Sequence, residues 1–230
     1  MLVTGGASGI GRAIAEEGLA RGWDVVVIDR EAAPVGTGVK ADLADADSTR
    51  AALEEALAAG PITRLVNNVG AVFPGALQEQ SLAEVDAAYQ LNLRCAVQCA
   101  QALLPGMTQA GFGRIVNMAS RAALGKELRT AYAASKAGLI GLTRVWALEL
   151  GPLGITVNAI GPGPIATELF AKANDEERTR QIVEAVPVRR MGTPDDIAHS
   201  AGYFLDERAG FVTGQTVYVC GGLTVGVAQV

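Results

Sequence analysis

The chain has 230 residues, of which 50% are hydrophobic and 19% are charged, and its formal net charge at pH 7 is −5. A chain of this length can bury a core without disulfides or a structural metal, and we expect a single domain over residues 1–230. The negative charge offers no basic face to a nucleic acid backbone, so nucleic acid is not an expected partner.

Short β-branched runs alternate with longer Ala- and Leu-rich runs at helical spacing, which predicts βαβ units around a parallel sheet. Several of the short runs are continuously apolar, as in strands buried on both faces. In chain order we expect a strand at 2–4, a helix at 10–21, strands at 24–28 and 38–41, a helix at 47–59, a strand at 64–67, a helix at 81–109, a strand at 113–117, a helix at 131–150, a strand at 156–160, a helix at 194–205 and a strand at 215–219. The run 81–109 is long for one helix, and we expect a break in it.

Cysteines and terminal segments bear on location. Cys95, Cys99 and Cys220 are an odd number of thiols, which favours free cysteines packed in the core of a protein in a reducing compartment. With one histidine in the chain they make a poor metal site, and no metal is expected.

The chain starts without the features of a signal peptide, so we expect a cytoplasmic protein. The uncharged stretch 210–230 could cross a bilayer, but its glycines favour a strand and a packed tail, and no membrane contact is expected.

The first chemical motif, Thr4-Gly5-Gly6-Ala7-Ser8-Gly9-Ile10-Gly11, lies between an expected strand and an expected helix. Glycines there let the backbone approach a pyrophosphate, and the first free N–H groups of the helix point at the phosphate oxygens. A glycine-rich turn can also be only a tight turn, but its place after the first strand favours a dinucleotide site.

Asp29 directly follows the expected strand 24–28, where a carboxylate accepts hydrogen bonds from the hydroxyls of the adenosine ribose. The alternative for Asp29 is a solvated loop acid. The carboxylate favours NAD, because it would repel the 2′-phosphate of NADP. Arg30 is a guanidinium next to it that could bind that phosphate, so NADP stays open.

The second motif is Tyr132-Ala133-Ala134-Ser135-Lys136. On a helix, Tyr132 and Lys136 share one face, and a nearby ammonium would lower the pKa of the phenol from its ordinary value near 10. Such a pair can serve as a general acid/base, although Tyr-x-x-x-Lys is also common as a surface pair. Ser120 lies just beyond the expected strand 113–117, on the side of an open α/β sheet where ligands bind, and this favours a site.

With these motifs in order, the sequence resembles the shorter, single-domain members of the short-chain dehydrogenase/reductase family over essentially its whole length. The motifs that carry the resemblance are the glycine motif from Thr4 to Gly11, Asn67-Asn68-Val69-Gly70, Leu91-Asn92-Leu93, Ser120 with Tyr132-x-x-x-Lys136, and Pro162-Gly163 with Thr167. The resemblance implies a three-layer doubly wound Rossmann sheet of about seven parallel strands. It also implies an NAD(P)-dependent oxidoreductase that transfers a hydride between nicotinamide and a carbonyl or secondary alcohol, a small-molecule substrate.

The resemblance further implies roles for individual residues. The catalytic tetrad would be Asn92, Ser120, Tyr132 and Lys136, with Asn92 helping to hold a proton-relay water. The cofactor would be bound by Gly5, Ser8, Gly9, Ile10, Gly11, Asp29, Arg30, Asp42, Leu43, Asn68, Gly70, Tyr132, Lys136, Pro162, Gly163, Ile165 and Thr167. Within this set Asp42 and Leu43 would border the adenine, and the backbone of Ile165 and the hydroxyl of Thr167 would hold the nicotinamide carboxamide.

Three features depart from the family pattern. Val69 replaces the usual alanine, a small change that should leave cofactor binding intact. Ser120 and Tyr132 are twelve positions apart, one fewer than in many relatives, so we expect the loop with Lys126, Glu127 and Arg129 to shape an unusual pocket. Between the strands at 24–28 and 38–41 there is no room for the usual crossover helix.

Substrate class stays open, because the expected specificity segment 166–190 has no readable code. The alternatives are an acyl-carrier-protein ketoreductase and a sugar or polyol dehydrogenase. A non-catalytic dinucleotide-binding sensor is disfavoured, because it has no need of Ser120, Tyr132 and Lys136. An apolar last strand at the sheet edge must be covered, and together with the resemblance this predicts a homotetramer, with a dimer as fallback.

Overall fold

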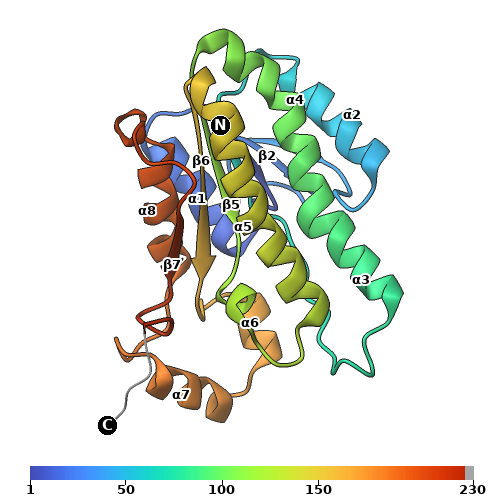
Figure 1. Cartoon of the computed structure of the whole chain (residues 1–230), viewed down its shortest axis with the longest axis vertical. Coiled ribbons are helices and arrows are strands. Elements are labelled where there is room, and N and C mark those ends of the chain that lie inside the picture. Colours follow the sequence, from blue (N-terminus) through green and yellow to red (C-terminus); the bar gives the residue numbers. More distant parts are fainter. Residues whose placement is uncertain (226–230) are drawn as a thin grey trace.

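A seven-stranded parallel sheet runs through the middle of the computed structural model, which describes residues 1–225 (Figure 1). The strand order is β3-β2-β1-β4-β5-β6-β7, and all neighbouring pairs are parallel. The strands are β1 Leu2–Thr4, β2 Val26–Asp29, β3 Thr37–Lys40, β4 Arg64–Asn67, β5 Gly113–Met118, β6 Ile155–Pro162 and β7 Thr216–Val219. The predicted doubly wound sheet is confirmed, and every expected strand is present.

Helices cover both faces of the sheet, which gives the three layers. The α-helices are α1 Gly9–Ala20, α2 Ala46–Leu57, α3 Leu82–Tyr89, α4 Cys95–Ala110, α5 Thr130–Leu150, α6 Glu168–Ala173, α7 Glu176–Ala185 and α8 Pro194–Leu205. Helices α1 and α8 pack together on one face, and α2, α4 and α5 lie on the other (Figure 1). The sequence did not predict α6 and α7, which lie beyond the carboxyl ends of the strands, at the bottom of Figure 1.

The expected break in the run 81–109 is confirmed as a single π-helical turn, Gln90–Arg94, between α3 and α4. Such turns carry an extra residue per turn and are frequent at functional sites. This one holds Asn92, which is buried.

The side chains of successive strand residues pack into two separate cores, one on each face of the sheet. Leu2 and Leu65 belong to the core under α2, α4 and α5, while their neighbours Val3 and Val66 belong to the core under α1 and α8. This alternation explains why the strands are apolar without a polar face. Cys95 and Cys99 are buried in the first core, and all three cysteines are free and buried, as predicted.

The connection from β2 to β3, residues 30–36, holds no helix, which confirms the predicted loss of the crossover helix. Gly36 makes the tight return possible. Its φ is +73°, and a Cβ there would lie 2.6 Å from the carbonyl oxygen of Val25.

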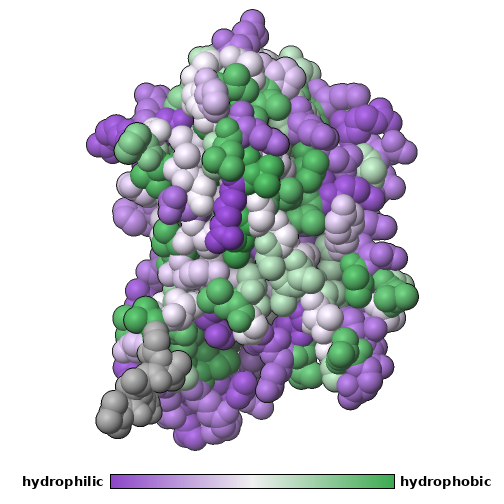
Figure 2. All heavy atoms as spheres, in the orientation of Figure 1, coloured by the Kyte–Doolittle hydropathy of each residue, from purple (hydrophilic) through white to green (hydrophobic). Residues whose placement is uncertain are grey.

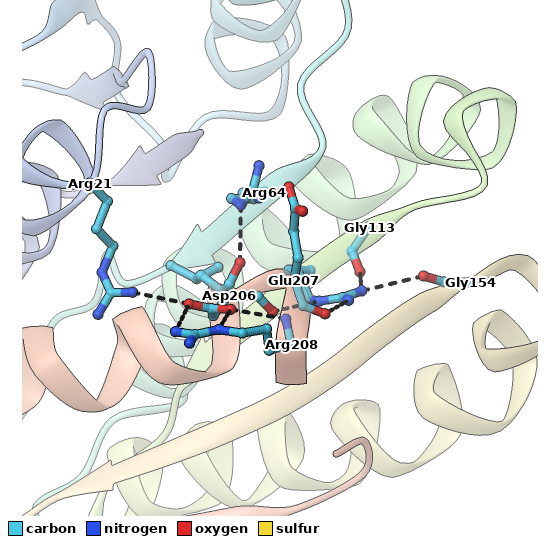
Figure 3. A network of polar contacts seen from close by, with 9 residues as sticks. Arg21, Arg64, Gly113, Gly154, Asp206, Glu207 and Arg208 are labelled. Atoms are coloured by element: carbon cyan, nitrogen blue, oxygen red, sulfur yellow. Dashed lines mark hydrogen bonds and ion pairs between the residues drawn. The ribbon is translucent and has the colours of Figure 1, made fainter. Parts of the chain in front are cut away.

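A network of arginines fixes the opposite, amino-terminal end of the sheet (Figure 3). The buried Arg114 of β5 donates to the carbonyl oxygens of Asp206 at 3.2 Å and Glu207 at 3.0 Å, just after α8. The Arg208 guanidinium holds the pKa of the Asp206 carboxyl well below its usual range, and Arg21 pairs with the same carboxyl. These contacts tie the end of α8 to the sheet and leave the other end of the molecule for a binding site.

Strand β7 lies at the edge of the sheet, as expected for the last strand. The final residues of the predicted tail, 226–230, lie outside the described residues. Within residues 1–225, none of the helices combines the length and the apolar character needed to span a membrane.

Candidate functional site

The glycine motif forms a tight loop between β1 and α1 that is locked to the end of β4. Thr4 Oγ1 accepts the N–H groups of Asn68 at 3.0 Å and Val69 at 3.2 Å. Asn68 Nδ2 donates to the carbonyl oxygen of Gly5 at 2.9 Å. A Cβ on Gly11 would lie 2.1 Å from that same carbonyl oxygen, so only glycine allows this turn.

The start of α1 has neither a side-chain cap nor an acidic residue in its first turn. Ser8 caps the helix, its side chain is exposed, and no side-chain capping bond is formed there. The first turn of α1 carries no acidic residue that would repel an anion. Gly9, with φ +53°, lies against the methyl group of Thr167, so the loop after β6 borders the same cradle. Free N–H groups at a helix start bind phosphate, and the arrangement fits the pyrophosphate of a dinucleotide.

Asp29 lies between the glycine loop and the short β2–β3 connection. Its carboxylate accepts the N–H of Ala7 at 3.0 Å and the N–H of Glu31 at 3.1 Å. Arg30 is exposed beside it. Both residues therefore lie at the edge of the phosphate cradle, where the sequence places the adenosine ribose.

Three of the predicted cofactor contacts turn their side chains into the protein. Leu43 and Ile165 are buried, and Ile10 packs against the core under α1 and α8. At Leu43 and Ile165 only the backbone is available to a cofactor, whereas the side chain of Ile10 is partly exposed. Asp42, by contrast, is exposed after β3, and its Oδ1 accepts the N–H of Ala44.

Tyr132 and Lys136 lie one turn apart near the start of α5, beside the end of β5. The ammonium of Lys136 is buried, is 5.8 Å from the centre of the Tyr132 ring, and donates to the carbonyl oxygen of Met118 at 2.7 Å. Burial lowers the pKa of Lys136 to about 8. The expected pairing of the two side chains on one face is confirmed.

Burial raises the pKa of Tyr132, because the phenolate is poorly solvated. A hydrogen bond with Ser120 and the positive charge of Arg129 act in the opposite direction but are weaker. The predicted net lowering of this pKa is therefore wrong for the protein alone, because the loss of water around the phenol outweighs the groups that favour the phenolate.

Asn92 and Gly70 meet Lys136 at the end of β4. Asn92 Oδ1 accepts the N–H of Ala71 at 2.8 Å, and its Nδ2 donates to the Ala71 carbonyl at 3.0 Å and to Ser135 Oγ at 2.9 Å. A Cβ on Gly70 would lie 3.1 Å from both Asn92 Oδ1 and Lys136 Nζ. The π-helical turn thus brings Asn92 to the same point as Lys136.

The last predicted segment follows β6 and closes the cradle from the other side. Pro162 ends β6, and the N–H of Gly163 donates to the carbonyl of Val219 at 2.9 Å. A Cβ on Gly163 would lie 2.6 Å from the Cα of Cys220. Thr167 caps α6, with its Oγ1 accepting the N–H of Phe170 at 3.2 Å, which leaves the hydroxyl proton for another partner.

The sequence did not reveal a buried polar chain beneath the site. Asn67 Nδ2 donates to Asn117 Oδ1 at 2.8 Å, Asn117 Nδ2 donates to Thr143 Oγ1 at 2.9 Å, and Thr143 donates to the Leu139 carbonyl at 2.7 Å. The chain links β4, β5 and α5 in a fixed register. The sequence contains one signal for this polar chain. Each of the strands Arg64–Asn67 and Gly113–Met118 carries an asparagine at or next to its carboxyl end.

A cavity of about 450 Å³ lies between residues 75–77 and 125–130, and Ala133 on α5 also lines it. The N–H of Gly75 donates to the carbonyl of Leu128 at 3.3 Å and joins the two loops. Lys126, Glu127 and Arg129 all line the cavity, so the shortened loop does form a pocket wall. Among residues 1–225 no cluster of three or more His, Cys, Asp or Glu side chains could hold a metal ion.

Comparison with known proteins agrees with this geometry. The family model described as enoyl-(acyl carrier protein) reductase matches residues 5–224. The chain is 37% identical to (2S)-[(R)-hydroxy(phenyl)methyl]succinyl-CoA dehydrogenase subunit BbsD of Thauera aromatica, over 96% of this chain and 94% of that protein. It is 34% identical to 3-oxoacyl-[acyl-carrier-protein] reductase FabG of Staphylococcus aureus, over 96% of each chain.

A solved structure from Beutenbergia cavernae, described as an NAD(P)-dependent gluconate 5-dehydrogenase with NADP bound, superimposes with a TM-score of 0.91. It is 34% identical in sequence, and the match covers 98% of this chain and 96% of that one. The match of fold, motifs and whole-length sequence leaves one assignment. The chain belongs to the short-chain dehydrogenase/reductase family of NAD(P)-dependent oxidoreductases.

Proposed function

We propose that Tyr132 is the proton carrier in a hydride transfer between the nicotinamide of NAD(P) and a secondary alcohol or ketone carbon. The observation that carries this proposal is the meeting of Ser120, Tyr132 and Lys136 beyond β5, beside the glycine cradle. A general acid/base must be within reach of the substrate oxygen, and Ala133, the residue after Tyr132 on α5, lines the cavity.

In alcohol oxidation the Tyr132 phenolate takes the hydroxyl proton while the Ser120 hydroxyl holds the substrate oxygen. The buried ammonium of Lys136 stabilises the phenolate through space. Asn92 fixes residues 70–71 beside Lys136 and so positions the wall of the site. Bound nicotinamide supplies the hydride acceptor, or in ketone reduction the hydride donor. In reduction the Tyr132 phenol gives its proton to the developing alkoxide.

NAD is the coenzyme we propose, on the strength of Asp29. Its carboxylate lies at the edge of the cradle, where it can accept ribose hydroxyls and repel a 2′-phosphate. We expect kcat/KM for NAD to exceed that for NADP by about 10-fold or more, and Asp29→Asn to reduce this ratio. Steady-state kinetics with both coenzymes measures it. A preference of the unaltered protein for NADP would show that Arg30 outweighs Asp29, in line with the NADP in the Beutenbergia cavernae structure.

A second candidate substrate class is the 3-oxoacyl or 3-hydroxyacyl thioester. It is favoured by two relatives whose names carry an acyl group on coenzyme A or on acyl carrier protein. A panel of acyl thioesters, gluconate-like polyols and simple secondary alcohols, tested with both coenzymes, separates the classes. Coenzyme binding without turnover of any member would favour the non-catalytic sensor.

A reducing, cytoplasmic location is supported by the three cysteines, which are free and buried. The hydrogen bond with Cys95, together with burial, raises the pKa of the Cys99 thiol, and this keeps the thiol protonated and unreactive. Cys95 and Cys99 therefore have the character of packing groups in the core.

We also propose a homotetramer, because two separate faces expose apolar side chains. Leu148 on α5 is 82% exposed, and Figure 2 shows hydrophobic residues over this part of the molecule. Phe211, before the edge strand β7, is fully exposed, and Tyr203 on α8 is more than half exposed. Each patch can pair with its own copy across a two-fold axis.

Light scattering tests the tetramer. The intact chain is expected to show four times the monomer mass, and Leu148→Asp and Phe211→Asp are each expected to give dimers, because each removes one two-fold contact. The double variant is expected to be a folded monomer by circular dichroism. An intact chain that is monomeric at micromolar concentration would contradict the proposal.

A further inference from the structure

Four cationic side chains lie in or near the loop that forms one wall of the cavity. Lys126 and Arg129 line the cavity, whereas Arg121, directly after Ser120, and Arg178, on α7, are close enough to Lys126 for their charges to act on it. In the part of the chain that the structure describes, none of the four is in an ion pair. Hydrophilic residues cover this lower end of the molecule, where α7 lies (Figure 2).

The four charges repel one another. Burial lowers the pKa of the Lys126 ammonium, and Arg129, Arg121 and Arg178 lower it further, in that order. A set of like charges that is partly desolvated is unfavourable in the protein alone. Four of the chain's 19 Lys and Arg residues meet here, although the net charge of the whole chain is −5. Glu127 is the one acid of the cavity wall, so the wall keeps a positive balance.

The cluster is on the substrate side of the site. Arg129 is close enough to Tyr132 for its charge to oppose the rise in the pKa of the phenol. The cofactor cradle, by contrast, is formed by the loops after β1 and β6 and by Asp29. Leu77 and Leu128 also line the cavity, and both are more than half exposed. The cavity therefore combines an apolar surface with positive charges. This combination suits a substrate with an apolar carbon chain and an anionic group at its end.

We propose that Arg121, Lys126, Arg129 and Arg178 bind an anionic group of the substrate, at a distance from the carbon that reacts. This inference rests on the proposed oxidoreductase function. The anion is a carboxylate at the end of the substrate chain or a phosphate of its carrier, since guanidinium and ammonium groups hold both through charge-assisted hydrogen bonds. Leu77 and Leu128 cover the chain between the anion and the carbonyl.

Two pairs of substrates test the inference. The first pair is a 3-oxo acid with a free terminal carboxylate and its methyl ester; the second is a 3-oxoacyl thioester of coenzyme A and of N-acetylcysteamine, which lacks the phosphates. We expect kcat/KM of the charged member to exceed that of the neutral member about 10- to 100-fold in at least one pair. The pair that shows the preference identifies the source of the anion.

The double variant Lys126→Gln/Arg178→Gln is expected to reduce that preference at least about 10-fold. It leaves Arg129 in place, so the charge near Tyr132 is retained. Arg144→Gln is the matched control: Arg144 is an exposed cation on α5, outside the cavity, and the preference should not change. Ratios near one in both pairs, or a preference that survives in the double variant, would overturn the inference.

A binding measurement keeps this test separate from the proposed function. Glutarate and inorganic pyrophosphate are titrated calorimetrically into protein saturated with NAD, which covers the phosphate cradle. At least one of them is expected to bind, with Kd about 10-fold weaker in the double variant than in Arg144→Gln. If no substrate turns over but this difference is found, the proposed reaction fails and the anion site stands. Equal binding in both variants would remove the anion site whatever the turnover.

Discussion

Tyr132→Phe is expected to lower kcat by about 10²- to 10⁴-fold and to leave the Kd of the coenzyme nearly unchanged. The substitution removes only the hydroxyl, and the ring still fills its place beside Lys136. The loss therefore reports proton transfer and not packing. Tyr89→Phe, at an exposed tyrosine on α3, is the matched control and should retain full activity.

The pH profile distinguishes a proton carrier from a side chain that only shapes the pocket. Burial raises the pKa of Tyr132, so the phenol persists through neutral pH. Ketone reduction needs the phenol and should fall only as pH rises through that pKa, whereas alcohol oxidation needs the phenolate and should increase with pH. Residual activity of Tyr132→Phe should lack this titration. A variant with most of its activity and an unchanged profile would exclude Tyr132 as the acid/base.

The sheet was predictable because its strands are apolar on both faces and separated by clear helical periodicity. The exact ends of the strands were less predictable, because they depend on pairing with neighbouring strands. Residue 24 was expected in a strand, but β2 starts at Val26, whose N–H donates to the carbonyl oxygen of Met1. Helix α7 was missed because most of its residues are charged or polar and none of them is buried in the core. Its Asp175 cap, which accepts the Arg178 N–H at 2.7 Å, was the available signal.

The site was predictable where chemistry depends on local spacing. The glycine motif and the Tyr132–Lys136 pair each lie on one loop or helix, and the structure keeps them as expected. Features that depend on distant contacts were not predictable. The buried link from Asn67 to Asn117 joins two strands, and the pKa of Tyr132 depends on the water that folding removes. The cation cluster likewise needs α7 to come next to residues far away in the sequence.

Gly11→Ala tests the cradle itself and is expected to weaken coenzyme binding by at least about 100-fold. The new Cβ would lie 2.1 Å from the carbonyl oxygen of Gly5 and 2.4 Å from Asn68 Nδ2. The first of these is backbone in a loop that Thr4 and Asn68 already tie to β4, so it cannot move without opening the turn. We also expect a loss of about 2–4 kcal/mol in the free energy of unfolding.

Gly141→Ala is the matched control, because it adds the same methyl group on α5 where no atom lies within 4 Å of it. Alanine in a helix interior should raise the free energy of unfolding by about 0.5–1 kcal/mol and leave coenzyme binding unchanged. Urea unfolding and NADH fluorescence titration measure the two quantities separately. If Gly11→Ala were destabilised but bound NADH as tightly as the unaltered protein, the glycine loop would be a structural turn only. The pyrophosphate would then have to bind away from the start of α1, and the position of Asp29 could no longer support a choice of coenzyme.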